Sequence, residues 1–349
     1  MRRIATVLTA IAALIGAAQL GPMAQATAVG AVSVFAHVPA PGHPDTSIVA
    51  PDGTVIVSTN RGARGSVGPS KLLRYSTAGR LLRTYTLKGQ NVASDHGAMG
   101  MALDKQGRLY VADYAPPRVL RIDLHTGSQT TFATVPDLSA CVVSGVGCDN
   151  GVGDQKPWPD GLAFTRDGEL LVTDLAQGTI FTVAASGGVA QIWLQDPRFR
   201  STFGPNQLVF DKDGSLVVDV TASLGPTTLG RGVVYRIPIA SDGRPGALHQ
   251  VYATGVGEGP DGFAIGASGR IYLCTLVTDR VITIGVDGSE QASFQHVMGP
   301  AGFDSPSSAT FLGSDLLVTN LTYFTDNPAD DLVLRVHVND RAIAAYPFR

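Results

Sequence analysis

The sequence predicts an all-β protein, a six-bladed β-propeller of four-stranded antiparallel blades, and three observations support this. A short segment recurs six times, the copies keep one internal register, and each is followed by alternating apolar residues broken by Gly, Asp and Pro. Self-similarity at roughly 40–50 residues, with several short strands per unit, is typical of β-propellers. A single unit cannot bury both faces of its sheet, so the units must stack around an axis.

The first five copies place a turn glycine eight positions after their opening residue. The opening residues are Asp45, Met99, Asp160, Asn206 and Asp261, and a degraded sixth copy offers Ser307 or Ser308. Because the register is constant, we expect these residues at equivalent positions, where each innermost strand begins. In a propeller those positions converge on the central channel.

Each repeat reads as four strands, as the second copy illustrates. Alternating apolar positions and turn residues predict strands at Gly100–Asp104, Arg108–Ala112, Val119–Asp123 and Gln129–Val135. The N-terminal segment Ala31–Val38 has no partner in its own blade. We expect it to form the outer strand of the sixth blade, beside Leu332–Val338, and so to close the ring and remove exposed sheet edges.

Composition and the chain start define the domain organisation. Residues 1–26 read as a signal peptide, with Arg2 and Arg3, an apolar run and an A-x-A site ending at Ala26. Residues 27–349 then form one propeller domain, which we expect to be secreted or periplasmic. The alternative reading of the apolar run is a membrane anchor. If this segment is cleaved, we expect no membrane association. The net charge of −3 does not indicate the excess of basic residues that nucleic-acid binding requires.

Three cysteines fit an exported protein. Cys141 and Cys148 flank a short glycine-containing loop, and an oxidising compartment permits a disulfide between them. The alternative is two unpaired thiols. Cys274 lies in an apolar strand and reads as a buried small hydrophobe.

Long connections gather on one face of the predicted disc. Those between second and third strands are long in blades one, four and six, at Asn60–Ser70, Thr221–Gly232 and Leu321–Asp331, and the segment leading into blade three, Leu138–Trp158, is longer still. Long loops on one face of a rigid scaffold are where binding sites usually lie. Trp158, Tyr114 and Phe324 are candidates for apolar walls around the channel mouth, although surface packing would explain them equally.

Four channel positions carry oxygen-bearing side chains, Asp45, Asp160, Asn206 and Asp261. Carboxylates packed together raise one another's pKa values unless a cation neutralises them. Carboxylate and amide oxygens without His or Cys favour a hard divalent cation, Ca²⁺ before Mg²⁺ or Zn²⁺. The alternative is that each residue, following a proline in every case, simply makes a turn hydrogen bond.

The phased copies WPDGLAFTRDGELLVTD, GPNQLVFDKDGSLVVD and GPDGFAIGASGRIYLCT, with the C-terminal AIAAYPF, resemble the senescence marker protein/gluconolactonase/luciferin-regenerating enzyme family of six-bladed propellers. The resemblance covers essentially the whole chain after residue 26. It implies one divalent cation held by Asp45, Asn206 and Asp261, with substrate touching Pro159 and Asp160. Two departures are that Asp45 replaces a longer Glu and that Pro159 replaces an amide side chain, which weakens any transfer of sugar specificity.

Two histidines are further candidates. His96 lies three residues before Met99 and resembles the histidine that paraoxonase-like lactonases place beside their calcium; we expect it at the rim, as a proton-transfer group. His43, two residues before Asp45, is a weaker candidate. A solvated turn residue is the alternative for each.

These features favour a cation-dependent hydrolase of lactones or related esters, acting on a small-molecule substrate. The ion would polarise the carbonyl, and a channel carboxylate, Asp261 first and Asp160 second, would take a proton from the attacking water. Two alternatives remain: a non-catalytic propeller that binds a ligand or protein, and a metal-dependent lyase. The absence of G-x-S-x-G, HExxH and phosphate-loop motifs disfavours serine hydrolases, zincins and nucleotide enzymes.

Overall fold

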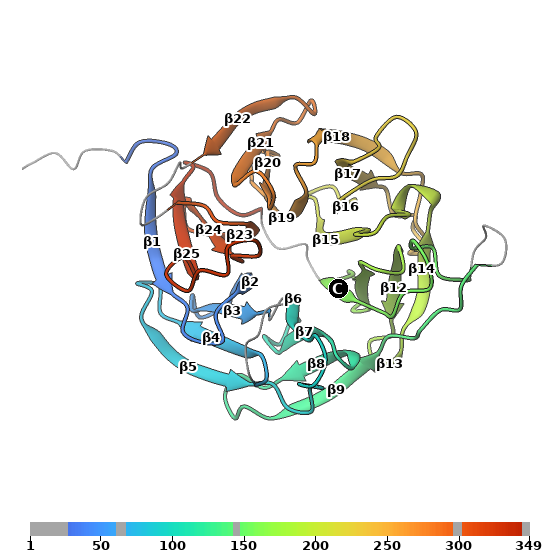
Figure 1. Cartoon of the computed structure of the whole chain (residues 1–349), viewed down its shortest axis with the longest axis horizontal. Coiled ribbons are helices and arrows are strands. Elements are labelled where there is room, and N and C mark those ends of the chain that lie inside the picture. Colours follow the sequence, from blue (N-terminus) through green and yellow to red (C-terminus); the bar gives the residue numbers. More distant parts are fainter. Residues whose placement is uncertain (1–26, 61–67, 142–146, 296–301, 344–349) are drawn as a thin grey trace, which may run out of the picture.

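The computed structural model describes residues 27–60, 68–141, 147–295 and 302–343. These residues form six antiparallel sheets arranged as blades around a central axis, as Figure 1 shows. The fold predicted from the repeats is therefore confirmed. The proposed signal peptide at 1–26 and most of the C-terminal AIAAYPF segment lie outside the described residues. No helix of the described part is long and apolar enough to cross a membrane.

Each blade runs from an inner strand outward. The strands of blades one to three are β2 (Pro44–Val49), β3 (Val55–Thr59), β4 (Lys71–Tyr75) and β5 (Leu81–Thr86); β6 (Ala98–Leu103), β7 (Leu109–Tyr114), β8 (Pro117–Ile122) and β9 (Gln129–Thr134); and β10 (Pro159–Phe164), β11 (Leu170–Asp174), β12 (Thr179–Val183) and β14 (Gln191–Gln195). A two-residue strand, β13 (Gly188–Val189), pairs in parallel with β9 and links blades three and two.

The remaining blades follow the same plan. Their strands are β15 (Pro205–Phe210), β16 (Leu216–Val220), β17 (Arg231–Ile237) and β18 (His249–Val256); β19 (Pro260–Ile265), β20 (Ile271–Thr275), β21 (Arg280–Ile284) and β22 (Glu290–Gln295); and β23 (Pro306–Leu312), β24 (Asp315–Asn320), β25 (Leu332–His337) and β1 (Val32–His37). The pairing of β1 with β25, from Val32 opposite Val336 to His37 opposite Leu332, confirms that the N-terminal segment closes the ring.

Apolar second and third strands make the core between neighbouring blades. Strands β3, β11 and β16 are buried at every position, as expected for strands covered on both faces. Their side chains mix across blade boundaries, so that Phe181 of blade three packs in one cluster with Tyr110 and Phe132 of blade two. The ring is thus held together by contacts between blades as well as within them.

Neighbouring inner strands approach closely, which explains two glycines of the repeat. A Cβ on Gly161 would lie 2.5 Å from the carbonyl oxygen of Asn206, and one on Gly262 would lie 2.5 Å from that of Ser307. Both contacts are with backbone, which cannot move aside. The glycine of the PDG triplet is therefore required where the inner strand of one blade meets the next.

Candidate functional site

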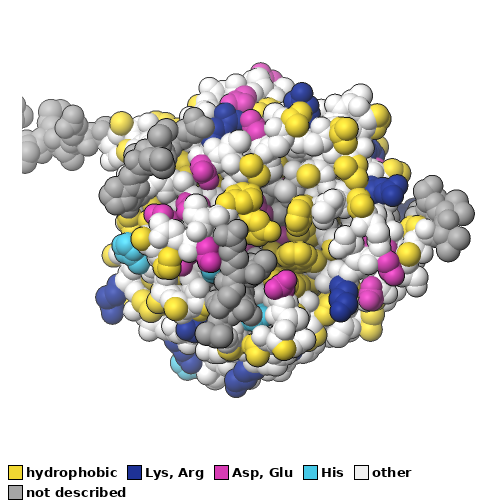
Figure 2. Space-filling model, in the orientation of Figure 1, with side chains coloured by type: hydrophobic (Ala, Val, Ile, Leu, Met, Phe, Trp, Pro, Cys, Tyr) yellow, Lys and Arg dark blue, Asp and Glu magenta, His cyan; other side chains and the backbone are white. Residues whose placement is uncertain are grey.

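A cavity opens at one end of the central channel, where the inner strands begin. Its lining includes Asp45, Met99, Asp160, Asn206 and Asp261, which are the five positions that the repeat register aligned. Residues from the connections after β3, β16 and β24 also line it, including Asn60, Thr221 and Tyr323. On the face seen in Figure 2, hydrophobic side chains gather around the centre of the disc, with acidic side chains among them.

A break in strand register directs these residues to the channel. In all six blades the pairing of the first and second strands shifts near the beginning of the inner strand. In blade three, for example, Pro159 pairs with Asp174 and Leu162 with Val172, with the shift between them. Such β-bulges re-aim side chains and are common beside active sites. Asp160 lies within the bulge of blade three, and Asp45, Asn206 and Asp261 lie in the corresponding bulges.

Hydrogen bonds join the polar residues in two groups. Asn206 Nδ2 donates to Asp261 Oδ1 at 2.5 Å and to Thr221 Oγ1 at 3.3 Å. Across the ring, Asn60 Nδ2 donates to Asp45 Oδ2 at 3.1 Å, and Thr46 Oγ1 donates to Asp45 Oδ1 at 3.0 Å. Asp45, Asp160 and Asn206 are buried, whereas Asp261 is half-buried and is the most open of the four.

Burial and mutual repulsion make ionisation of the three carboxyl groups unfavourable. Burial, followed by the charge of Asp45, raises the pKa of Asp261. Burial raises the pKa of Asp160 well above its usual range, and the charges of Asp45, Asp261 and Asp219 act in the same direction. For Asp45, burial raises the pKa against the opposing hydrogen bonds from Asn60 and Thr46. Among the described residues that line this cavity, none is Lys, Arg or His to offset the charge.

This donor set fits a hard divalent cation. Buried carboxyl groups with amide partners, and no cationic side chain among them, are stabilised when an ion neutralises them. Within the described residues, no three His, Cys, Asp or Glu side chains cluster closely enough to hold an ion by themselves. An ion bound here would therefore need the amide oxygen of Asn206 as well as carboxylates, in keeping with the predicted set of Asp45, Asn206 and Asp261.

Beneath the channel residues lies a buried acidic side chain, Asp219, that sequence reasoning missed. Its Oδ1 accepts a hydrogen bond from the backbone N–H of Gln207 at 2.9 Å, while its Oδ2 is buried and has no partner among the described residues. Burial raises its pKa well above the usual range, and the charge of Asp261 adds to the effect. The signal was present in the sequence: blade four ends its second strand with VVDV, where blade three has LVTD, so the aspartate is shifted by one residue.

The hydroxyl groups at the position of Asp219 in other blades have a structural role. Ser58 Oγ donates to the carbonyl oxygen of Met99 at 3.0 Å, and Thr319 Oγ1 donates to that of Asp45 at 2.6 Å. Thr173 Oγ1 bonds the carbonyl oxygen of Asn206 in the same way. Each bond links one blade to the inner strand of the next, and an ionised Asp219 cannot donate such a bond.

The structure corrects the expected position of His96. The ring is fully buried rather than at the rim, with Nδ1 2.8 Å from the carbonyl oxygen of Ser94 and Nε2 2.9 Å from that of Gly68. Both ring nitrogens face backbone oxygens, and His96 is not among the described residues that line the cavity. This environment anchors a loop and leaves no ring nitrogen directed at a substrate.

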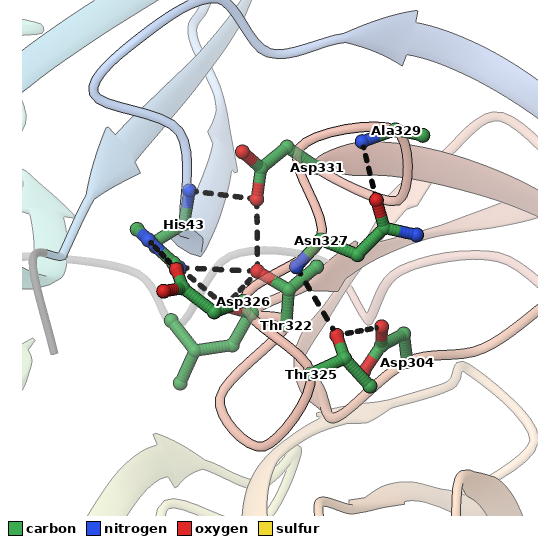
Figure 3. A network of polar contacts seen from close by, with 9 residues as sticks. His43, Asp304, Thr322, Thr325, Asp326, Asn327, Ala329 and Asp331 are labelled. Carbon is green, nitrogen blue, oxygen red and sulfur yellow. Dashed lines mark hydrogen bonds and ion pairs between the residues drawn. The ribbon is translucent and has the colours of Figure 1, made fainter. Parts of the chain in front are cut away.

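Two other candidates also act away from the cavity. His43 is buried in a polar network with Asp326 and Asp331, shown in Figure 3. Ser307 Oγ donates to the backbone oxygen of Asp45 at 2.7 Å and so links two blades. Neither Ser307 nor Ser308, the two candidates from blade six, is among the described residues that line the cavity. Asn60 and Thr221, which sequence reasoning did not single out, take part in the polar group instead. Both directly follow a second strand, which is the only signal that could have indicated them.

The predicted disulfide is present and borders the segment leading into blade three. Cys141 and Cys148 are bonded, with Cα atoms 5.0 Å apart, and Cys274 is a buried free cysteine, as predicted. Gln195 Nε2 donates to the carbonyl oxygen of Cys148 at 2.7 Å. The disulfide thus stabilises a segment that ends at Trp158 in the cavity wall.

No protein-family profile matches the chain, and no curated protein matches it at the sequence level. Solved structures do match. A structure described as a "putative gluconolactonase" is 18% identical with a TM-score of 0.59, covering 90% of this chain and 93% of the other. Regucalcin from Agrobacterium tumefaciens, described as a calcium-binding protein, is 17% identical with a TM-score of 0.59, covering 91% and 99%.

A third similar structure is virginiamycin B lyase from Staphylococcus aureus. It is 15% identical with a TM-score of 0.54, and the match covers 83% of this chain and 82% of the lyase. At such identities the likeness establishes the shared fold and leaves the chemistry to be argued from the site. The resemblance to gluconolactonase-like six-bladed propellers that the sequence indicated is confirmed in the fold.

Proposed function

We propose that the protein is a cation-dependent hydrolase of lactones or related esters, acting outside the cytoplasm. The observation that carries the proposal is a group of three carboxyl side chains in an open cavity, the buried Asp45 and Asp160 and the half-buried Asp261, with no Lys, Arg or His among the described residues that line it. Such an arrangement costs folding free energy, and clusters with perturbed pKa values are characteristic of functional sites. The fold-level likeness to the gluconolactonase and regucalcin structures supports the same class.

Asp45, Asn206 and Asp261 are the residues that would hold the cation. When bound, Ca²⁺ would supply Lewis-acid polarisation of a carbonyl oxygen. Asn206, whose amide donates to Asp261 at 2.5 Å, fixes the orientation of that carboxylate.

Asp261 is our first candidate for the general base, because it is more accessible than Asp160, which is only 5% exposed. In the proposed step, a water oxygen attacks the carbonyl carbon while Asp261 accepts a proton from that water. The C–O bond to the leaving oxygen then breaks, and the proton passes to this oxygen, giving a hydroxy acid.

Metal content and thermal unfolding test the cation. Protein purified without chelator should contain one divalent ion per chain, and its melting temperature should rise with the logarithm of calcium concentration because the ion binds the native state. Asp261→Asn should weaken this response, whereas Asp167→Asn, at an exposed hairpin position, is the matched control. An unchanged melting temperature in calcium and in chelator, with no stoichiometric metal, contradicts the cation site.

A panel of lactones followed by pH-stat and product mass tests the reaction. Hydrolysis releases one proton equivalent and adds one water to the product mass. A product of unchanged mass would instead indicate elimination, the chemistry that the lyase alternative requires. No turnover with any lactone, together with stoichiometric metal, would favour the binding propeller.

A further inference from the structure

The walls of the cavity differ in chemistry from its floor. The polar side chains, Asp45, Asn60, Asp160, Asn206, Thr221 and Asp261, belong to the channel floor or adjoin it. Apart from glycines, the rest of the lining is formed by apolar and aromatic side chains, among them Leu175, Phe203 and Leu276. A ligand reaching the carboxyl groups must therefore pass between apolar surfaces.

Aromatic side chains stand on two sides of this cavity. On one side, Trp158 lies against Tyr114 with ring centroids 4.7 Å apart and meets Phe203 edge-on at 6.4 Å. On the other, Tyr323 and Phe324 meet edge-on at 5.1 Å. Trp158 precedes blade three and the Tyr323–Phe324 pair belongs to blade six, so the two groups approach from opposite sides of the six-bladed ring.

The Tyr323–Phe324 pair lies on a connection that is held in place. In Figure 3, Asp331 Oδ1 accepts hydrogen bonds from the His43 backbone N–H at 3.0 Å and from Thr322 Oγ1 at 2.9 Å. His43 Nε2 lies 3.1 Å from Asp326 Oδ1, and Thr325 Oγ1 donates to Asp304. These bonds clamp the chain on both sides of the aromatic pair, so the apolar wall is in place before a ligand arrives.

Several of these apolar side chains remain exposed to solvent. Phe203, Val277, Tyr323 and Phe324 are 37%, 48%, 39% and 50% exposed, although all line the cavity. Covering them with a ligand would remove apolar surface from water. Polyhydroxylated rings would instead leave hydroxyl groups against apolar walls without partners, which is unfavourable. Anionic ligands would face the carboxyl groups without any Lys, Arg or His among the described lining residues.

We propose that the site selects an uncharged lactone or ester with an alkyl or aryl substituent, in preference to a sugar lactone. The carbonyl end would meet the carboxyl floor, and the substituent would lie between the Trp158 side and the Tyr323–Phe324 side. The position of the carbonyl end rests on the proposed function. The preference for an apolar substituent rests on the apolar side chains of the cavity walls. The cavity volume of about 280 Å³ is just below the roughly 300–1,000 Å³ typical of ligand pockets, which suits a small single-ring compound.

A homologous series tests this selection. The kcat/KM of δ-lactones with propyl, pentyl and heptyl substituents should rise by about threefold for each methylene that the walls bury, and D-glucono-δ-lactone should be the poorest substrate. Equal or better turnover of the sugar lactone overturns the inference of apolar selection but is consistent with the proposed hydrolase function.

A binding experiment separates failure of the inference from failure of the proposed function. The δ-lactams with the same substituents lack the ester bond, and their affinities are measured by calorimetry on the calcium-loaded protein. Tighter binding with chain length supports the apolar selection even if no lactone is turned over. Affinities independent of chain length overturn it whatever the activity.

Matched variants locate the effect. Phe324→Ser should reduce heptyl-lactam affinity about fivefold, as expected for half of a buried aromatic contact, and should affect the propyl compound less. Leu82→Ser, at an exposed position of β5 (42% exposed) outside the lining residues, should change neither. An unchanged heptyl affinity in Phe324→Ser and in Tyr323→Ser, with unchanged melting temperatures, overturns the assignment of this wall.

Discussion

Blades three and four share one backbone plan but place their acidic side chains differently. In blade three, Asp160 faces the channel, Thr173 lies below it, and Asp174 ends the second strand; in blade four these positions hold Asn206, Asp219 and Val220. Asp174 is fully partnered, accepting hydrogen bonds from the backbone N–H groups of Trp158, Ala176 and Gln177. Asp219, one residue earlier in its strand, has one oxygen for which the described part of the chain supplies no partner.

The comparison distinguishes a carboxylate that stabilises the fold, Asp174, from one that lowers its stability, Asp219. Asp174 satisfies the backbone of the connection beside the cavity, although burial still raises its pKa to about 6. A shift of one residue in a strand turns the side chain to the other face, and so Asp219 lies under the channel with Asp160 and Asp261. Stability is lowered there because one oxygen of the buried Asp219 carboxyl group has no hydrogen-bond partner among the described residues, which is expected where function requires it.

The largest expected effect compares the two channel carboxylates of blades three and five. Asp261→Asn keeps the volume but removes the basic oxygen, so turnover should fall by roughly 10²–10⁴-fold. Asp160→Asn should have a smaller effect if Asp160 is not the base. Steady-state kinetics at saturating calcium measure both variants. A larger loss at Asp160 exchanges the two roles, and full activity in both removes carboxylate base catalysis from the channel.

Exchanging residues between blades should change stability in opposite directions. Asp174→Thr leaves several buried N–H groups without an acceptor, so the free energy of unfolding should fall by about 3 kcal/mol. Asp219→Thr removes the carboxyl oxygen that has no partner among the described residues. It also introduces the hydroxyl that blades three and six use to join their neighbours. It should raise the free energy of unfolding by about 1–3 kcal/mol.

Urea denaturation at pH 8 without metal provides both values. A loss of stability in Asp219→Thr would mean that the hydrogen bond from the Gln207 backbone N–H to this carboxyl group outweighs the cost of its second oxygen.

The positions that follow from the repeat register could be predicted from sequence, and those that depend on connections could not. A constant spacing to the turn glycine aligned Asp45, Asp160, Asn206 and Asp261 in one ring, because equivalent residues in equivalent blades must share a place. Asn60 and Thr221 also follow the register, since each lies 15 residues after the opening residue of its copy and directly after a second strand. Phe203 and Tyr323 lie on connections, where no register applies and packing against other blades decides their position. His96 was misplaced for the same reason: its loop folds inward and buries the ring.

The pH dependence of stability provides a weaker test of the channel cluster. Folding raises the pKa of Asp45 to about 6 and that of Asp261 to about 8, whereas both would ionise near 3.9 in the unfolded chain. Their stabilising contribution is therefore complete below about pH 4 and is lost as pH rises through 6 and 8. In chelator, the free energy of unfolding should fall by up to about 2–3 kcal/mol per pH unit between pH 4 and 6, where both groups contribute, and by about half as much between pH 6 and 8.

Calcium should reduce this decrease in the free energy of unfolding per pH unit, because a bound cation favours the ionised carboxylates. Asp261→Asn, measured in chelator, should also reduce the decrease. A melting temperature that rises between pH 5 and 8 in the metal-free protein would contradict the raised pKa values.

The smallest effect concerns the segments that lead into the two blades. The segment before blade four buries Phe199 completely against Tyr235 in the core, whereas the one before blade three is closed by the Cys141–Cys148 disulfide at the surface. A disulfide that closes so short a loop constrains the unfolded chain only modestly. Reduction should therefore lower the free energy of unfolding by about 2 kcal/mol or less and leave the propeller folded.

Intact mass after alkylation under denaturing conditions, with and without reductant, should show one reactive cysteine before reduction and three after it. Three alkylated cysteines without reduction would rule out the bridge, and the segment leading into blade three would then depend on hydrogen bonds such as that from Gln195 to Cys148.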